Sequence, residues 1–299
     1  MKRNLLICAL LLMTPSFGMA QGLEPIEGGR TFYFTPNGGP VDGVCDGSLT
    51  CPWANLQNAY DYVRTHFRLA SGAITFKLAD GVYPTGLQVT GPLPGQQSPH
   101  LFRIIGNVAT PSAVVIRPSG TQPSFVAAYS GMFYLDGVKM DHVNTMQDSI
   151  LIGQEASVIL GNVEFGYNFN PYNHISVQFG GYLEVTKSYT ISGGAQCHIL
   201  MGDTSKGYYA TNGQQNLINV AITGNPEFYV AFLCVRGASS LNAQAIGWNG
   251  AARGRKFLIE FSALDIGGTE PCDVPGNQPG RIRYGGQLLT HPGDFVQGN

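Results

Sequence analysis

A strand pattern that returns about every 25 residues dominates the middle of this chain. Alternating apolar residues mark short strands that contain Ile150, Ile175 and Ile199, which are 25 and 24 positions apart. A second series runs in step, because Val138 and Val163 are also 25 positions apart. No helical pattern lies between these strands, so parallel pairing requires a crossover made of further strands. The spacing therefore predicts an all-β chain whose short parallel strands are stacked into a coil.

The first twenty residues have the features of a secretory signal peptide. Lys2 and Arg3 precede a short apolar run from Leu5 to Met13, and small residues end the segment at Ala20. We therefore expect cleavage after residue 20 and export to the periplasm or the extracellular space. No later stretch approaches the roughly 20 apolar residues of a spanning helix, so we expect no membrane association after cleavage.

Low charge and many glycines favour a folded β protein and argue against a nucleic-acid partner. The chain carries 17 basic and 19 acidic residues, and the part after residue 20 has a formal charge of −4. Nucleic-acid binding usually requires a basic face. Charged residues make up 12% of the chain, hydrophobic residues 43%, and 40 of the 299 residues are glycine. This composition is typical of a β-solenoid with turn-rich walls and not of a disordered chain.

Five cysteines remain after the signal peptide, and export makes disulfides permissible. Cys45 and Cys51 flank a turn-rich loop, so we expect a disulfide between them. Cys197 and Cys234 lie in strands of the same series and are expected to face the core as small hydrophobic residues. With five cysteines, including Cys272, at least one remains free or pairs between chains. No spacing among them indicates a zinc site.

One amphipathic helix is expected near the N-terminus, over residues 52–67. Its apolar residues recur at helical spacing; they are Leu56, Ala59, Tyr60, Val63 and Phe67. This helix is expected to cover the first strands of the coil, which have no preceding strand to pair with. The expected organisation is a signal peptide at 1–20, a strand, cysteine loop and capping helix at 21–70, a parallel β-helix at 71–268 and an irregular C-terminal wrap at 269–299.

The order of motifs along the chain is specific enough to compare with known folds. The export signal is followed by a short strand, the cysteine loop, the helix "PWANLQNAYDYV", the strand "ITFKLADGVY" and the repeated strands. This order resembles the pectin-lyase-like superfamily of right-handed parallel β-helices. The later segments "YTISGGAQCHILMG", "VAITGNPEFYVAFLCV" and "PGRIRYGGQ" resemble tail-fibre-like or tailspike-like β-helix proteins of phage and bacterial genomes.

The resemblance implies a single-stranded right-handed parallel β-helix, a solenoid, with one N-terminal capping helix. It implies no single activity, because β-helices include lyases, hydrolases, esterases and passive adhesins. Fibres of this kind often trimerise, so a homotrimer is one assembly that the resemblance implies.

Catalytic residues of the β-helix enzymes are matched only in fragments. Met140-Asp141-His142 resembles the Asp-His pair of pectate lyases, which also use calcium-binding acids, but the second arginine expected after Arg117-Pro118 is absent. If the chain is a polysaccharide lyase or a glycoside hydrolase, the candidate catalytic residues are Asp141, His142, Asp148, Glu164 and Lys187. Calcium is then the one expected ion, and no other cofactor or metal is expected.

Two arrangements of charged residues leave alternatives open. Four polar residues fall within 13 positions, and they are Asp136, Asp141, His142 and Asp148. They could hold calcium, supply an acid and a base, or stabilise ordinary turns. The repeat also places Lys139 beside Glu164, which predicts a surface ion pair, the alternative being a catalytic lysine with an acid partner.

Aromatic residues in the turns indicate a surface that binds sugar rings. Sugar rings stack on aromatic faces, and loops on rigid scaffolds commonly carry binding sites. The expected carbohydrate contacts are Tyr167, Phe169, Tyr172, His174, Tyr208 and Tyr209. The alternative is a ladder of aromatic rings that only supports the turns.

The leading functional hypothesis is an exported protein that recognises polysaccharide along the wall of its solenoid. The alternatives are a polysaccharide lyase or glycoside hydrolase, and a non-catalytic structural fibre or adhesin.

Overall fold

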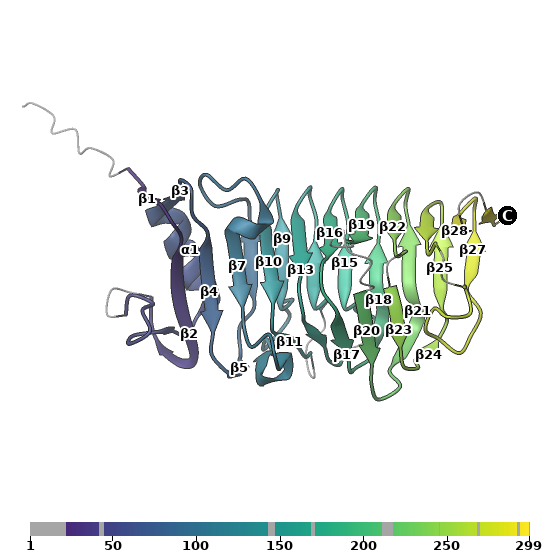
Figure 1. The fold of residues 1–299 in the computed structure, drawn as a ribbon, viewed down its shortest axis with the longest axis horizontal. Helices are drawn as coiled ribbons and strands as arrows, with labels where there is room; N and C mark the ends of the chain where they lie inside the picture. The colour runs from purple at the N-terminus through teal and green to yellow at the C-terminus, as the bar shows by residue number, and fades with distance from the viewer. Residues whose placement is uncertain are drawn as a thin grey trace, which may run out of the picture.

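The computed structural model describes residues 22–41, 45–142, 147–168, 171–210, 218–244, 246–267, 270–291 and 294–298. In these segments the chain is almost entirely β, with one α-helix, α1 (Leu56–His66), at the N-terminal end of the stack (Figure 1). Two short 3-10 helices, η1 (Pro99–Leu101) and η2 (Pro111–Ala113), lie in loops. The expected signal peptide falls outside the described residues.

The strands form three large sheets and one small one. The eleven-stranded sheet has the spatial order β2 (Arg30–Gly39), β4 (Ile74–Leu78), β7 (Phe102–Ile105), β10 (Met132–Asp136), β13 (Ser157–Leu160), β16 (Tyr182–Val185), β19 (Lys206–Tyr209), β22 (Ser240–Asn242), β26 (Ala263–Asp265), β28 (Gln287–His291) and β29 (Asp294–Gln297). The seven-stranded sheet has the order β5 (Gly81–Tyr83), β8 (Val114–Ile116), β11 (Lys139–Met140), β14 (Glu164–Phe165), β17 (Tyr189–Ile191), β20 (Ile218–Ile222) and β23 (Ile246–Asn249). The nine-stranded sheet has the order β6 (Leu87–Thr90), β9 (Phe125–Ala128), β12 (Ile150–Ile152), β15 (Ile175–Val177), β18 (Ala195–Met201), β21 (Glu227–Arg236), β25 (Phe257–Glu260) and β27 (Arg281–Arg283), with β24 (Arg253–Gly254) beside β21. The small sheet pairs β1 (Glu24–Ile26) with β3 (Phe67–Leu69).

The chain visits the three large sheets in a fixed cyclic order. From β5 to β23 it passes from the seven-stranded to the nine-stranded to the eleven-stranded sheet and then begins again. We call each such pass a circuit. Each strand pairs in parallel with the strand of the preceding circuit, and the stack of circuits is elongated (Figure 1). This arrangement of stacked parallel strands is compatible with a parallel β-helix.

The 25-residue spacing predicts the register through the middle of the stack. Ile150 is paired with Ile175, and Ile175 with Ile199, so this part of the prediction is confirmed. In the next circuit Ile199 pairs with Leu233, which is 34 positions away instead of about 25. The pairing of β18 with β21 also contains a register shift of one residue between residues 195 and 197.

The sequence pattern does not separate the seven-stranded sheet from the eleven-stranded sheet. The segment from Tyr134 to Met140 has the appearance of one strand, but it is divided between β10 and β11, which belong to different sheets. Gly137 lies at the corner with a φ of 70°, a conformation that glycine adopts without the steric penalty of a side chain. Each circuit therefore contains three strands, one in each large sheet.

The core is built from columns of apolar residues that point inward from successive circuits. One column runs through the nine-stranded sheet, and its members are Leu87, Phe125, Ile150, Ile175, Ile199, Leu233 and Phe257. All of them are buried. Because each side chain is covered by its counterparts in the neighbouring circuits, the hydrophobic gain of one circuit depends on the next.

The two ends of the stack differ from its parallel middle. At the C-terminal end, β29 pairs with β28 antiparallel and finishes the eleven-stranded sheet. The segment expected to be an irregular wrap at 269–299 therefore contains three strands. Within the described residues, no helix combines the length and apolarity needed to cross a membrane.

Helix α1 forms where the sequence predicts a helix and covers the N-terminal end. The Asn55 side chain accepts a hydrogen bond from the Asn58 amide at 2.9 Å, which caps the first turn. Strand β6 begins the nine-stranded sheet, so its outer edge has no strand to pair with. The Gln57 side chain takes that place, because its amide oxygen accepts from Gln88 N at 2.8 Å and its amide nitrogen donates to Gln88 O at 3.3 Å.

We expect Gln57→Ala to lower the free energy of unfolding by about 1–3 kcal/mol, because two backbone groups of the edge strand lose their partners. Urea unfolding followed by circular dichroism measures the change. Asn58→Ala is the matched control, since Asn58 is exposed on the same helix and alanine favours helix. Equal stability of the two variants would contradict the capping role of Gln57.

Candidate functional site

An open cavity of about 500 Å³ lies on the outer face of the eleven-stranded sheet. Its lining comes from β7, β10, β16 and the residues that adjoin them: His100, Arg103, Ile105, Tyr134, Asp136, Glu184, Thr186 and Lys187. The volume falls within the range of roughly 300–1,000 Å³ that is typical of small-molecule sites. Strands packed on a common core hold these side chains, so the cavity has a rigid floor.

Asp136 anchors the floor of the cavity. Its carboxylate accepts hydrogen bonds from the Tyr134 hydroxyl at 2.7 Å and the Asn162 backbone amide at 2.8 Å. Lys187 forms an ion pair with the same carboxylate at 2.6 Å. Partial burial lowers the pKa of Lys187, but the bonds to Asp136 and Tyr134 outweigh it and raise that pKa above its usual value. Lys187 therefore stays protonated and does not act as a base.

The sheet register lines up the other side chains of the face in one row. Tyr134 lies beside Arg103 on one side and Ile159 on the other, and the row continues with Glu184 and Tyr208. Adjacent strands are about 4.8 Å apart, so Tyr134 and Tyr208 are separated by about 14 Å. The row therefore contains a cation, an aromatic ring, an aliphatic side chain, a carboxylate and a second aromatic ring, in that order.

A second tyrosine enlarges the aromatic end of this row. The rings of Tyr182 and Tyr208 have their centroids 5.5 Å apart on adjacent strands. At the other end, Arg103 donates its Nε hydrogen to the carbonyl oxygen of His100 at 2.6 Å. Within the described part of the chain, no acidic side chain forms an ion pair with Arg103. Its terminal nitrogens are therefore available to a ligand.

Sequence reasoning singled out Asp136, Lys187 and Tyr208 but missed the other side chains of the cavity face. The 25-residue repeat carries the missing signal, because it places Tyr134, Glu184 and Tyr208 at equivalent outward positions. Counting outward as well as inward columns would have identified them.

Three of the candidate catalytic residues, Asp141, His142 and Asp148, lie between the seven-stranded and nine-stranded sheets, in the segment that joins β11 to β12. Asp141 forms an ion pair with Arg117 at 2.6 Å, and His142 is buried with its Nε2 2.8 Å from the Ser124 hydroxyl. Asp148 accepts from the backbone amide of Asn173 at 2.7 Å. None of these three lines the cavity.

The ion pair expected between Lys139 and Glu164 is present on adjacent strands, with an N–O distance of 2.8 Å. Glu164 also accepts a hydrogen bond from the Ser192 hydroxyl at 2.6 Å, which leaves it engaged in a local surface network. Among the described residues, no group of three or more histidine, cysteine, aspartate or glutamate side chains could hold a metal ion. The polar cluster around Asp136 and Asp148 is therefore spread over separate contacts.

The aromatic residues expected to bind carbohydrate do not share one surface. Tyr167 is exposed after β14, Tyr172 is half-buried before β15, and Tyr208 lies on the outer face of the eleven-stranded sheet. His174 and Tyr209 are a correction to the expected set, because both are buried in the core and have no surface to offer a glycan. Phe169 lies outside the described residues.

His174 and Tyr209 instead belong to a hydrogen-bonded chain inside the core. His174 Nε2 lies 2.9 Å from the carbonyl oxygen of Gly166, which can only accept, so Nε2 carries the proton. His174 Nδ1 then accepts from His198 Nδ1 at 3.1 Å. His198 Nε2 accepts from the Tyr189 hydroxyl at 2.7 Å, and that oxygen accepts from the Tyr209 hydroxyl at 2.8 Å. Every link is satisfied with both rings neutral.

Burial keeps these histidines neutral. It lowers the pKa of His174 to about 3, although bonds to two backbone carbonyls oppose the shift. Burial also lowers the pKa of His198 well below its usual value, and that of His142 to about 4. None of the three is available as a proton donor near neutral pH.

Two disulfides are present in the described residues. Cys45 and Cys51 are bonded, as the loop between them predicts, with a Sγ–Sγ distance of 2.07 Å. Cys197 and Cys234 form a second disulfide between β18 and β21, which corrects the expectation that they are core-facing thiols. They belong to a small apolar cluster apart from the main core. Cys272 is the free cysteine and is exposed.

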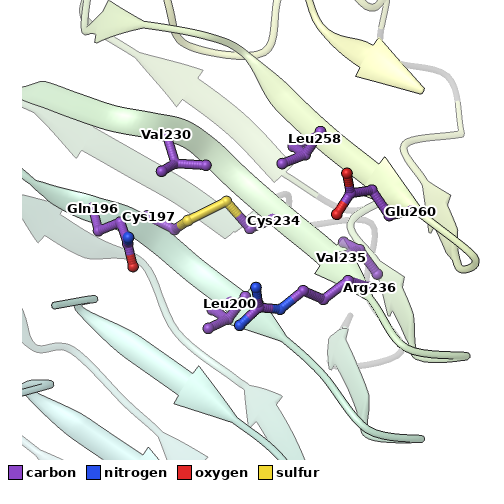
Figure 2. A pocket seen from close by; sticks show the side chains of 9 residues that line it. All are labelled: Gln196, Cys197, Leu200, Val230, Cys234, Val235, Arg236, Leu258 and Glu260. Atoms are coloured by element: carbon purple, nitrogen blue, oxygen red, sulfur yellow. A yellow bond between two sulfur atoms is a disulfide. The ribbon is translucent and has the colours of Figure 1, made fainter. Parts of the chain in front are cut away.

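The second disulfide borders a narrow cavity of about 60 Å³ (Figure 2). Leu200, Val230 and Leu258 surround the sulfur atoms, with Arg236 and Glu260 at the rim. This volume is far below that of a typical ligand site, so the cavity does not fit a sugar ring. The bridge closes a loop of 37 residues, for which chain entropy predicts a stabilisation of about 4 kcal/mol.

Acid is expected to destabilise the fold through its buried histidines. The folded-state pKa values of His142, His174 and His198 lie below the unfolded value of 6.5, so the unfolded chain binds more protons between these values. The free energy of unfolding therefore has its full value above pH 6.5 and decreases as the pH falls. The loss at pH 5 is on the order of 2 kcal/mol for each histidine. Burial raises the pKa of Asp148, which opposes this trend near its own pKa.

Urea unfolding at pH 7.5 and pH 5.0 measures this loss. His142→Gln keeps a group that can bond to Ser124 and removes one of the three titrating histidines. The difference in free energy of unfolding between pH 7.5 and pH 5.0 should therefore decrease by about a third. Equal stability of the original chain at both pH values would contradict neutral buried histidines.

Comparison with known proteins identifies no relative of this chain. No protein-family model, no curated protein and no solved structure matches the chain. The functional assignment therefore depends on the geometry of the described residues.

Proposed function

We propose that the chain is an exported right-handed parallel β-helix that recognises polysaccharide on the outer face of its eleven-stranded sheet. The observation that carries this proposal is the open cavity of about 500 Å³ with Tyr134, Asp136 and Glu184 in its wall. Two disulfides are compatible with an oxidising compartment and so with export.

The chemistry of the cavity suits a glycan better than an apolar ligand. Sugars combine apolar ring faces with hydroxyl groups that donate and accept hydrogen bonds. The rings of Tyr182 and Tyr208 can stack on such faces, while Glu184 and Arg103 offer an acceptor and donors along the same row. The row extends over several strands, so it has room for more than one sugar unit.

Recognition without cleavage is favoured by the state of the acidic groups. Glycoside hydrolysis requires one carboxyl group that acts as an acid and a second that acts as a base or nucleophile. Asp136 accepts hydrogen bonds from three protein donors, so its carboxylate is already engaged within the protein. Asp141 and Glu164 are paired with Arg117 and Lys139 outside the cavity. Glu184 is then the one carboxylate of the cavity face without a recorded ion pair.

We expect Glu184→Gln to weaken glycan affinity about tenfold, because a charged acceptor contributes roughly 1.5–3 kcal/mol to a hydrogen bond and 1.4 kcal/mol is a factor of ten. The melting temperature should stay unchanged, since Glu184 is only half-buried. Affinity electrophoresis of residues 21–299 against a panel of soluble neutral and acidic polysaccharides, with and without calcium, measures the effect. Glu27→Gln is the matched control, being an exposed carboxylate outside the cavity.

The same incubations separate the alternative functions. Retention without new products supports recognition, whereas unsaturated products or new reducing ends identify a lyase or a hydrolase. If no polysaccharide is retained or cleaved, the proposal fails, and a trimer detected by light scattering would favour a structural fibre or adhesin.

A further inference from the structure

Four exposed aromatic residues lie on the turns that lead from the nine-stranded to the eleven-stranded sheet. Tyr129, Phe179, Phe261 and Tyr284 are 65%, 60%, 63% and 55% exposed, respectively. We call these four residues the aromatic ridge. Each follows a strand of the nine-stranded sheet and precedes one of the eleven-stranded sheet, so the ridge follows one edge of the stack (Figure 1).

Backbone hydrogen bonds between successive turns align the ridge. Ser130 N donates to Gln154 O at 2.9 Å, and Glu155 N donates to Phe179 O at 3.1 Å. The series continues with the pairs Gly180–Asp203, Thr204–Gly237 and Ala238–Phe261. The equivalent positions of successive circuits are therefore Tyr129, Gln154, Phe179, Asp203, Gly237 and Phe261, and the Tyr284 ring stacks on Phe261 with a centroid distance of 5.1 Å.

The backbone at these aromatic residues is in a conformation that suits glycine. Their φ angles are 52°, 51°, 52° and 52°, and bulky residues with positive φ are outliers. The equivalent residues of the other circuits, which are Gln154, Asp203 and Gly237, have φ angles of 54°, 54° and 68°, so every one of these turns requires a positive φ. Because these aromatic rings are exposed, they contribute little hydrophobic stabilisation to the fold. Stability alone therefore does not explain why aromatic residues occupy these positions. Such strain is found where a residue serves binding.

The residues between the rings indicate the ligand. Gln154 and Asp203 alternate with Tyr129 and Phe179, so ring faces and hydrogen-bonding groups follow one another at about 4.8 Å. A polymer with apolar ring faces and hydroxyl edges matches this alternation. Glu155 and Asp203 place carboxylates on either side of Phe179, which disfavours an anionic polymer at that part of the edge, while Arg236 lies farther along it, before Gly237.

We propose that the aromatic ridge binds a linear neutral polysaccharide whose chain runs along the stack of circuits. The ridge precedes the strands of the eleven-stranded sheet, while the cavity lies toward the ends of β10 and β16. It is a separate surface, and it does not depend on glycan binding in the cavity. A convex ridge contacts internal segments of a long chain and requires no chain end.

The test compares the double variant Tyr129→Asn/Phe179→Asn with the original chain for retention on cellulose, insoluble starch and chitin. We expect retention to fall at least tenfold, which corresponds to the loss of 1.4 kcal/mol. Asparagine tolerates positive φ, so the melting temperature should stay the same or rise. Tyr229→Asn is the matched control, because Tyr229 is an exposed tyrosine of β21 outside the ridge.

Four outcomes would contradict the proposal that the ridge binds neutral glycan. They are no retention of the original chain, equal retention of the double variant, a preference for polygalacturonate or alginate, and a clearly lower melting temperature of the double variant, which would indicate a structural role. An oligomer of the original chain that the double variant loses, measured by light scattering, would identify a protein interface instead. Loss of binding in Glu184→Gln alone would support the cavity and contradict the ridge.

Discussion

The backbone hydrogen-bond ladder between successive circuits is the interaction on which the rest of this structure depends. It stacks equivalent residues of each circuit, so that Ile150, Ile175 and Ile199 bury one another in a single column. No circuit can bury its own apolar face, and stability is therefore collective. The two ends of the ladder are vulnerable for the same reason. Gln57 of α1 binds the edge of β6 at one end, and the antiparallel strand β29 finishes the eleven-stranded sheet at the other.

The same ladder determines what the surface can do. Outward residues are repeated at about 4.8 Å just as inward residues are, so a surface row can change without disturbing the core. The cavity row with Tyr134 and Glu184 and the aromatic ridge with Phe179 both arise in this way. One architecture thus offers two extended surfaces, each aligned by register rather than by a dedicated loop.

Polar residues inside the stack follow a different rule. His174 and His198 are buried at equivalent positions of adjacent circuits, where every hydrogen bond must be made within the protein. Their neutral rings form a continuous chain with Tyr189 and Tyr209, and a shift of register would break it. The chain therefore supports the pairing that the apolar columns establish, and it makes that pairing sensitive to acid.

The sequence by itself determined the periodic features, because alternation and spacing are local properties. It predicted helix α1, the columns of isoleucine, the Lys139–Glu164 ion pair and the disulfide across the short cysteine loop. Alternation distinguishes inside from outside only along a straight strand.

At corners such as Gly137 the chain changes sheet, and counting along the sequence no longer indicates direction. Only the tertiary structure therefore decided that Ile199 pairs with Leu233, that Cys197 meets Cys234, and that His174 is buried. It alone brought Arg103, Tyr134 and Glu184 to one cavity, because their proximity depends on pairing between strands that are distant in the sequence.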